Sequence, residues 1–72
     1  MTPAQAISAA LTRGGVTTQR AQATVLNEHY QHWNRYLSGG RAPSTTKVQR
    51  WLESARTAGH PITLTWTAEG AL

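Results

Sequence analysis

The sequence has no cysteine, few acidic residues and no long hydrophobic run. Without cysteine the chain can form neither a disulfide framework nor a thiolate metal site, which is compatible with a reducing compartment. No segment is long and apolar enough to span a membrane, and residues 1–15 lack the basic start and continuous apolar stretch of a signal peptide. We therefore expect a soluble cytoplasmic protein that does not bind a membrane.

Residue patterns for catalysis or metal binding are also missing. The three acidic residues are scattered along the chain, and no paired carboxylates, glycine-rich phosphate loop or nucleophile–base arrangement can be recognised. His29 and His32 are spaced by one helical turn, which could hold a metal ion, but no further ligand completes such a site. We expect a protein that is not an enzyme and that has no metal, cofactor or small-molecule ligand.

Basic residues outnumber acidic ones. Seven Lys or Arg residues against three Asp or Glu give a net charge of +4 over 72 residues, and all but one of the basic residues are arginine. A chain of this length forms one small domain with a modest core. The basic excess favours polyanionic partners, of which nucleic acid is the commonest, and guanidinium groups suit phosphates and guanine edges. Charge alone is weak evidence, since many small domains are basic by chance.

Apolar residues at helical spacing predict a first and a last helix around a central segment. The first helix begins with Thr2 as N-cap and Pro3 at its first position, and it ends at Gly14. The last helix begins after Ser44, which is also a good N-cap, and it ends before Gly59. The strongest amphipathic pattern in the chain lies on this last helix and consists of Val48, Trp51, Leu52 and Ala55.

The central segment, residues 19–43, reads as two short helices joined at Asn27. Asparagine tolerates the left-handed backbone conformation that a tight turn between helices requires. Thr17 or Thr18 can cap the first of these helices. The second extends over about residues 29–37 and has one apolar face, formed by Trp33, Tyr36 and Leu37. This arrangement indicates a helix-turn-helix.

A small residue (Ala23), an apolar residue three positions later (Leu26), the turn residue Asn27, an apolar helix and then SGGRAPS form a pattern within residues 17–55. This pattern resembles the Cro and lambda-repressor-like helix-turn-helix family. The resemblance implies a mainly α, compact four-helix domain over residues 1–61. It also implies that this domain binds double-stranded DNA with its second central helix, the recognition helix, in the major groove.

Two positions depart from the family pattern. Asn27 takes the place of the usual turn glycine, and Glu28 stands where an apolar residue is usual. The second departure predicts a shifted start of the recognition helix, with His29 or Tyr30 filling the space of the apolar residue.

The face of the recognition helix opposite Trp33 carries groups that hydrogen-bond to base edges. Gln31 and Asn34 each offer a donor and an acceptor, as adenine requires in the major groove, and Arg35 suits guanine or a phosphate. Tyr30, at the start of the helix, can reach a thymine methyl group or a phosphate. Because the family's geometry places this face in the groove, we expect these four residues to contact bases. Otherwise they are solvated side chains of an amphipathic helix.

Contacts with the phosphate backbone are expected on both sides of the recognition helix. The resemblance implies that Gln19 lies against the backbone and braces the recognition helix. It also implies that the SGGRAPS turn clamps the backbone, with the N–H groups of Gly39 and Gly40 close to a phosphate. Each of these polar side chains could instead be an ordinary solvated one. The expected phosphate contacts are Gln19, Arg20, Ser38, Arg41 and Lys47.

Residues 62–67 have a different pattern from the rest of the chain. Ile62, Leu64 and Trp66 alternate with threonines, which predicts a β-strand. The sequence indicates no second strand for it to pair with, so we expect residues 62–72 to pair with the same segment of a second copy across a two-fold axis. Ile62, Leu64 and Trp66 would then form a homodimer interface. Alternatively, the segment packs as an extended tail on its own helices.

The function that this reading favours is sequence-specific regulation of transcription. A small dimeric Cro-like repressor would bind an inverted-repeat operator through the major groove, and the resemblance implies a phage or mobile element as its source. Two alternatives stay open. The chain could be a protein-binding module such as an antitoxin, whose strand docks on a partner, or an accessory DNA-binding subunit of an excision or replication complex.

Overall fold

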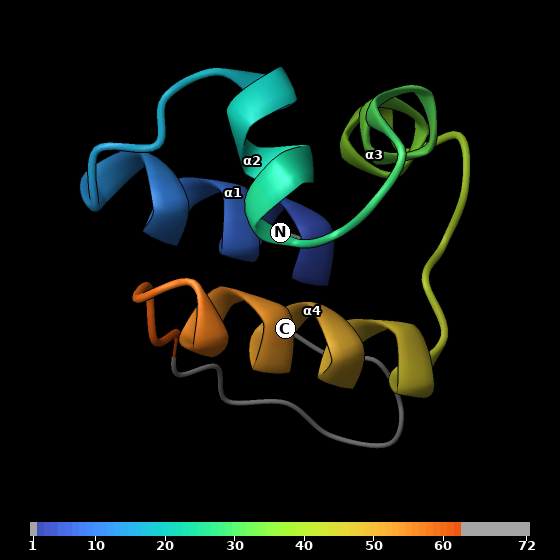
Figure 1. Ribbon diagram of the computed structural model, residues 1–72. Coiled ribbons are helices and arrows are strands. Elements are labelled where there is room, and N and C mark those ends of the chain that lie inside the picture. Colours follow the sequence, from blue (N-terminus) through green and yellow to red (C-terminus); the bar gives the residue numbers. More distant parts are fainter. Residues whose placement is uncertain (1, 63–72) are drawn as a thin grey trace.

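The computed structural model of the protein describes residues 2–62. Within these residues it contains no strand and four helices, α1 (Pro3–Arg13), α2 (Gln19–Val25), α3 (Tyr30–Ser38) and α4 (Thr45–Thr57). In Figure 1, α1 and α4 run across the view, α2 lies above α1, and α3 is seen end-on beside them. The mainly helical fold expected from the sequence is therefore confirmed over this part of the chain.

Short polar side chains set where the helices begin. Thr2 accepts a hydrogen bond from the backbone N–H of Gln5 at 3.2 Å, and the Gln5 side chain accepts one from the N–H of Thr2 at 3.1 Å. This reciprocal pair satisfies two backbone donors at the start of α1. Thr18, rather than Thr17, caps α2, and Ser44 caps α4 by accepting from the N–H of Lys47 at 3.1 Å. The caps predicted at Thr2 and Ser44 are confirmed.

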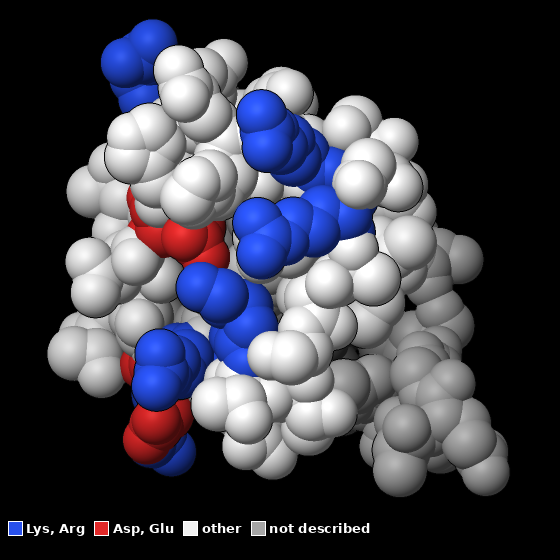
Figure 2. Space-filling model, turned by 90° about the vertical axis from the view of Figure 1, so that its right-hand side faces the viewer, with Lys and Arg blue, Asp and Glu red and all other residues white. Residues whose placement is uncertain are grey.

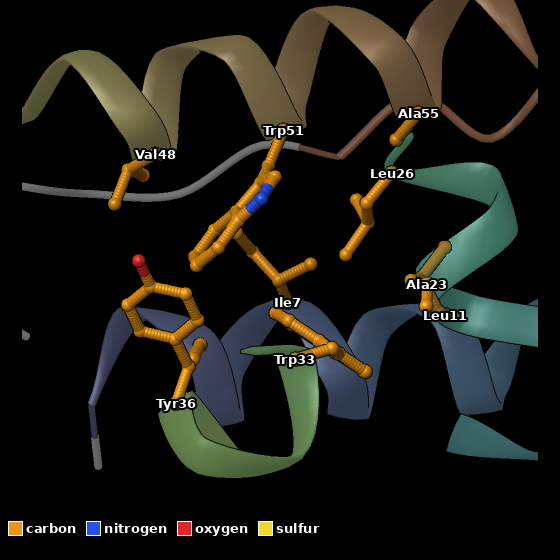
Figure 3. Packing of buried hydrophobic residues seen from close by; sticks show 10 residues of the cluster. Ile7, Leu11, Ala23, Leu26, Trp33, Tyr36, Val48, Trp51 and Ala55 are labelled. Atoms are coloured by element: carbon orange, nitrogen blue, oxygen red, sulfur yellow. The ribbon is translucent and has the colours of Figure 1, made fainter. Parts of the chain in front are cut away.

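The core is one cluster of apolar side chains from all four helices. Trp51 of α4 packs edge to face against two rings of α3, with its centroid 5.1 Å from that of Trp33 and 4.9 Å from that of Tyr36. Figure 3 shows these three rings turned towards one another, with Ile7 of α1 beside them. Trp33 and Tyr36 therefore serve the core, as their spacing predicts. The buried apolar residues are Ala4, Ile7, Leu11, Ala23, Leu26, Trp33, Tyr36, Val48, Trp51 and Ala55.

The turn between α2 and α3 has the predicted left-handed residue. Asn27 has a φ of 54°, a conformation that asparagine adopts more readily than most other residues. The N–H of Glu28 donates back to the carbonyl of Ala23 at 2.9 Å, which closes the turn. His29 follows as the N-cap of α3. The tight turn between α2 and α3 thus depends on one residue that accepts a positive φ.

The prediction that His29 or Tyr30 fills an apolar space beside the turn is wrong. Both residues are exposed. The Glu28 side chain, only 8% exposed, lies there instead, and its carboxylate accepts a hydrogen bond from the indole N–H of Trp51 at 3.1 Å. An acidic group is tolerated at this partly buried position because it is hydrogen-bonded.

Most of the predicted strand over residues 62–67, including Leu64 and Trp66, lies outside the described residues. Ile62 is described, and it is partly buried against the chain's own core cluster. None of the helices within residues 2–62 is both long enough and apolar enough to cross a membrane.

Candidate nucleic-acid interface

The outward side of α3 brings together the four predicted base contacts. Because α3 turns Trp33 and Tyr36 into the core, residues on its opposite side must face the solvent. All four are exposed, and they line a shallow depression on the surface: Tyr30, Gln31, Asn34 and Arg35. The exposed side of α3 therefore presents amide, guanidinium and phenol groups to a binding partner.

Asn34 is held in place by α2. Its Nδ2 donates a hydrogen bond to Oε1 of Gln19 at 2.7 Å. The structure thus joins α2 and α3 at the residue that was expected to brace the recognition helix. Each amide keeps its other polar atom for a further partner, so Asn34 offers its carbonyl oxygen and Gln19 its NH2 group. Gln31 and Arg35 have no such tie in the described part of the chain.

Arg20 lies beside the beginning of α3. Its guanidinium carbon is 4.8 Å from the centroid of the Tyr30 ring, which is the geometry of a cation–π contact. The stacking leaves the edge of the guanidinium group, with its N–H donors, available to an anion. Arg20 and Tyr30 thus lie stacked against each other at the beginning of α3.

The segment after α3 differs from the expectation in one respect. The N–H of Gly39 donates to the carbonyl of Tyr36 at 3.3 Å, and that of Gly40 donates to the carbonyl of Arg35 at 3.1 Å. Both groups close the end of the helix, where Gly39 has a φ of 85°, so they are not free for a phosphate. Ser38 also donates its hydroxyl hydrogen to the carbonyl of Arg35, at 3.0 Å.

Two basic residues remain near the end of α3 and the beginning of α4. Arg41 is exposed, and its guanidinium carbon lies 5.8 Å from the ring centroid of Tyr36. Lys47 is 35% exposed and pairs with Glu28, with 3.0 Å between Nζ and Oε2. An ammonium group has three donors, so the ion pair leaves Lys47 able to bind a second anion.

Glu28 is a residue of this region that the sequence did not assign. Burial raises the pKa of its carboxyl group, but hydrogen bonds from Lys47, Trp51 and the N–H of His29, together with the charge of Lys47, outweigh the burial. The pKa is therefore lowered from its ordinary value of 4.5. Glu28 joins the turn between α2 and α3 to α4 by its bonds with Lys47 and Trp51. Its departure from the family pattern was the only sequence signal of this role.

Positive charge gathers on this side of the molecule. Figure 2 views the side on which α3 and the beginning of α4 lie in Figure 1, and Lys and Arg side chains form a band across it. Acidic side chains border one edge of the band. The face that carries the exposed hydrogen-bonding side chains of α3 is thus also a basic face, which favours a polyanion.

The two histidines near the start of α3 lie close to each other. The ring centroids of His29 and His32 are 5.2 Å apart. Nδ1 of His29 accepts a hydrogen bond from the N–H of Gln31 at 3.3 Å and so caps the helix. Within residues 2–62 no group of three or more His, Cys, Asp or Glu side chains could hold a metal ion.

No protein-family model, no curated protein and no solved structure matches this chain.

Proposed function

We propose that this chain is a sequence-specific regulator that binds double-stranded DNA, with α3 as the recognition helix in the major groove. The observation that carries the proposal is the exposed side of α3, where amide and guanidinium groups face outward while the tryptophan and tyrosine rings of the helix are buried. A helix fits the major groove, and these are the groups that read base edges there. The helix-turn-helix geometry and the basic face point in the same direction.

The roles within the site follow from which side chains are free. Gln31 can form a bidentate pair with adenine, and Arg35 can form one with guanine N7 and O6. Asn34 is tied to Gln19, so it contributes an acceptor to a base while Gln19 donates to a phosphate. Arg20 and Arg41 bind phosphates on either side, and Lys47 adds a third such contact. Phosphate contacts position the protein on DNA, and base contacts select the sequence.

A single short helix reads too few base pairs to select one site. We infer that two copies pair through residues 62–67, so that two α3 helices enter successive major grooves about 34 Å apart on an inverted repeat. The chain would then act as a small Cro-like repressor that occludes a promoter. Replacing Leu64 with Asp should give a monomer in sedimentation equilibrium, and a dimer that persists would exclude strand pairing.

The test of DNA recognition is selection of sites from a random duplex library at low and at physiological salt. Enrichment of a palindrome that survives physiological salt supports the proposal. Binding that is independent of sequence and is lost with salt would leave only the electrostatic contribution. A protein partner at residues 62–67, as for an antitoxin, would then be the better hypothesis.

A matched pair of variants sharpens the test. Arg35→Ala and Arg56→Ala remove the same charge, but Arg56 is 72% exposed on α4 and lies at the far end of this helix from Lys47. Arg35→Ala should weaken binding to the selected site by about 1–3 kcal/mol and relax selection at one base pair. Arg56→Ala should change affinity far less. Equal losses in the two variants would show that α3 contributes charge but no base recognition.

A further inference from the structure

Gln22 of α2 is a polar side chain inside the apolar core. It is only 2% exposed, and among residues 2–62 no other polar or charged residue is buried to this degree. Burying an amide costs free energy unless its hydrogen bonds are satisfied. The hydrogen bonds of Gln22 must therefore offset this cost, and their partners indicate the role of the residue.

The Gln22 amide joins three helices and a loop. Its Oε1 accepts hydrogen bonds from Oγ of Ser8 in α1 at 2.9 Å and from Nε1 of Trp33 in α3 at 3.1 Å. Its Nε2 donates to the carbonyl of Val16 at 3.0 Å and to Oγ1 of Thr12 at 3.2 Å. A primary amide has two donors and two acceptor sites, so every one of them is used.

The bond to Trp33 constrains the rotation of α3 about its own axis. Apolar contacts are non-directional, so the rings of α3 alone would tolerate small rotations of the helix. The indole N–H points in one direction, and Trp33 is 0% exposed, so water cannot replace its acceptor. A rotation of about 20° would move a side-chain end about 6 Å from the axis by about 2 Å. That displacement would break a hydrogen bond to a base.

We propose that Gln22 is a positioning residue for DNA recognition. Through Trp33 it sets the angle at which α3 presents Gln31 and Arg35, and through Ser8 and Thr12 it fixes that angle relative to α1. It touches no base or phosphate. This inference depends on the proposed function, because only a bound partner makes the angle of α3 matter.

The main test compares Gln22→Met with Ser8→Ala in the full chain. Methionine keeps the volume and packing of glutamine, whereas Ser8→Ala removes another bond to the same oxygen and leaves the Trp33 bond intact. The readout is the ratio of affinities for the selected site and for an unrelated duplex, measured well below both melting temperatures. Gln22→Met should lower this ratio at least about tenfold, the order of magnitude of one lost base contact. Ser8→Ala should leave it unchanged.

The result that overturns the inference is a folded Gln22→Met variant with the wild-type ratio. A loss of equal size for both duplexes would overturn it too, because that pattern indicates a role in stability alone. Trp33→Phe removes the other partner of the same bond, so it should lower the ratio as well. Combining it with Gln22→Met should add little, and fully additive losses would contradict a shared bond.

A readout without DNA separates this inference from the proposed function. In the NMR spectrum of the wild-type chain, the indole N–H of Trp33, assigned by its absence in Trp33→Phe, should exchange as slowly as amides of the core. It should exchange rapidly in Gln22→Met and slowly in Ser8→Ala. Rapid exchange in the wild type would overturn the inference even if Gln22→Met did not fold. If the indole N–H of wild-type Trp33 exchanges slowly but the wild-type chain shows no preference among DNA sequences, the proposed function is refuted instead.

Discussion

Replacing Glu28 should show how strongly the turn between α2 and α3 depends on one carboxylate. Glu28→Ala removes the acceptor of the Trp51 indole N–H, which lies 3.1 Å from Oε2, and Trp51 is only 1% exposed. A buried donor left without a partner costs about 1–3 kcal/mol. The pair with Lys47, which is 35% exposed, adds less than about 1 kcal/mol because solvent screens it.

Together these contributions predict that Glu28→Ala lowers the free energy of unfolding by about 1–4 kcal/mol. A domain of 72 residues has a total of about 4–11 kcal/mol, so the loss is large. Glu28→Gln keeps an oxygen acceptor but loses the charge, and it should cost about 1–2 kcal/mol. Urea denaturation followed by circular dichroism measures both. A Glu28→Ala variant within about 0.5 kcal/mol of the wild type would refute the role of this carboxylate.

The same carboxylate predicts a specific dependence on pH. Because the pKa of Glu28 is lowered from its ordinary value of 4.5, its contribution is complete above that value and is lost as the pH falls through the folded-state pKa. The stability difference between wild type and Glu28→Gln should therefore shrink as the pH falls from 4.5 through the folded-state pKa of Glu28. Glu53→Gln is the control, since Glu53 is 75% exposed. A difference that stays constant over this range would contradict the assignment.

Three further predictions concern the fold, and urea denaturation measures each of them. Asn27→Val should destabilise the protein by about 1–3 kcal/mol, since a β-branched residue is strained at a φ of 54°, whereas Asn27→Gly should be nearly neutral. Ser44→Ala should cost about 1 kcal/mol by removing the N-cap of α4, and Ser44→Asp should restore it. Leu11→Ala should cost about 2–5 kcal/mol because Leu11 is 0% exposed in the core, and the conservative Leu11→Met should cost less than about 1.5 kcal/mol.

The exposed face of α3 could be predicted because it depends on helical periodicity alone. Once Trp33 and Tyr36 are assigned to the core, the outward position of Arg35 follows from the geometry of the helix. Gln22 was missed although one signal was present. It lies four residues before Leu26 and therefore on the buried side of the same turn. A polar residue there was not recognised as part of the core, because its partners belong to other helices.

The partners of the polar groups near the ends of α3 could be assigned only from the tertiary structure. The sequence allows the Gly39 and Gly40 N–H groups to bind a phosphate, but the end of the helix uses both. It also leaves Lys47 as a free cation, whereas the folded chain pairs this lysine with Glu28. In both cases a polar group has more than one possible partner, and the backbone path decides which one is close enough.

The sequence by itself determined the number of helices in residues 2–62, the caps at Thr2 and Ser44 and the left-handed turn at Asn27. Each depends on residues within one or two helical turns, where spacing and cap chemistry act locally. Only the tertiary structure decided the hydrogen bond between Trp51 and Glu28, 23 residues apart, and that between Trp33 and Gln22, 11 residues apart. Which residues become such partners depends on how the helices pack, and a local sequence pattern does not specify that packing.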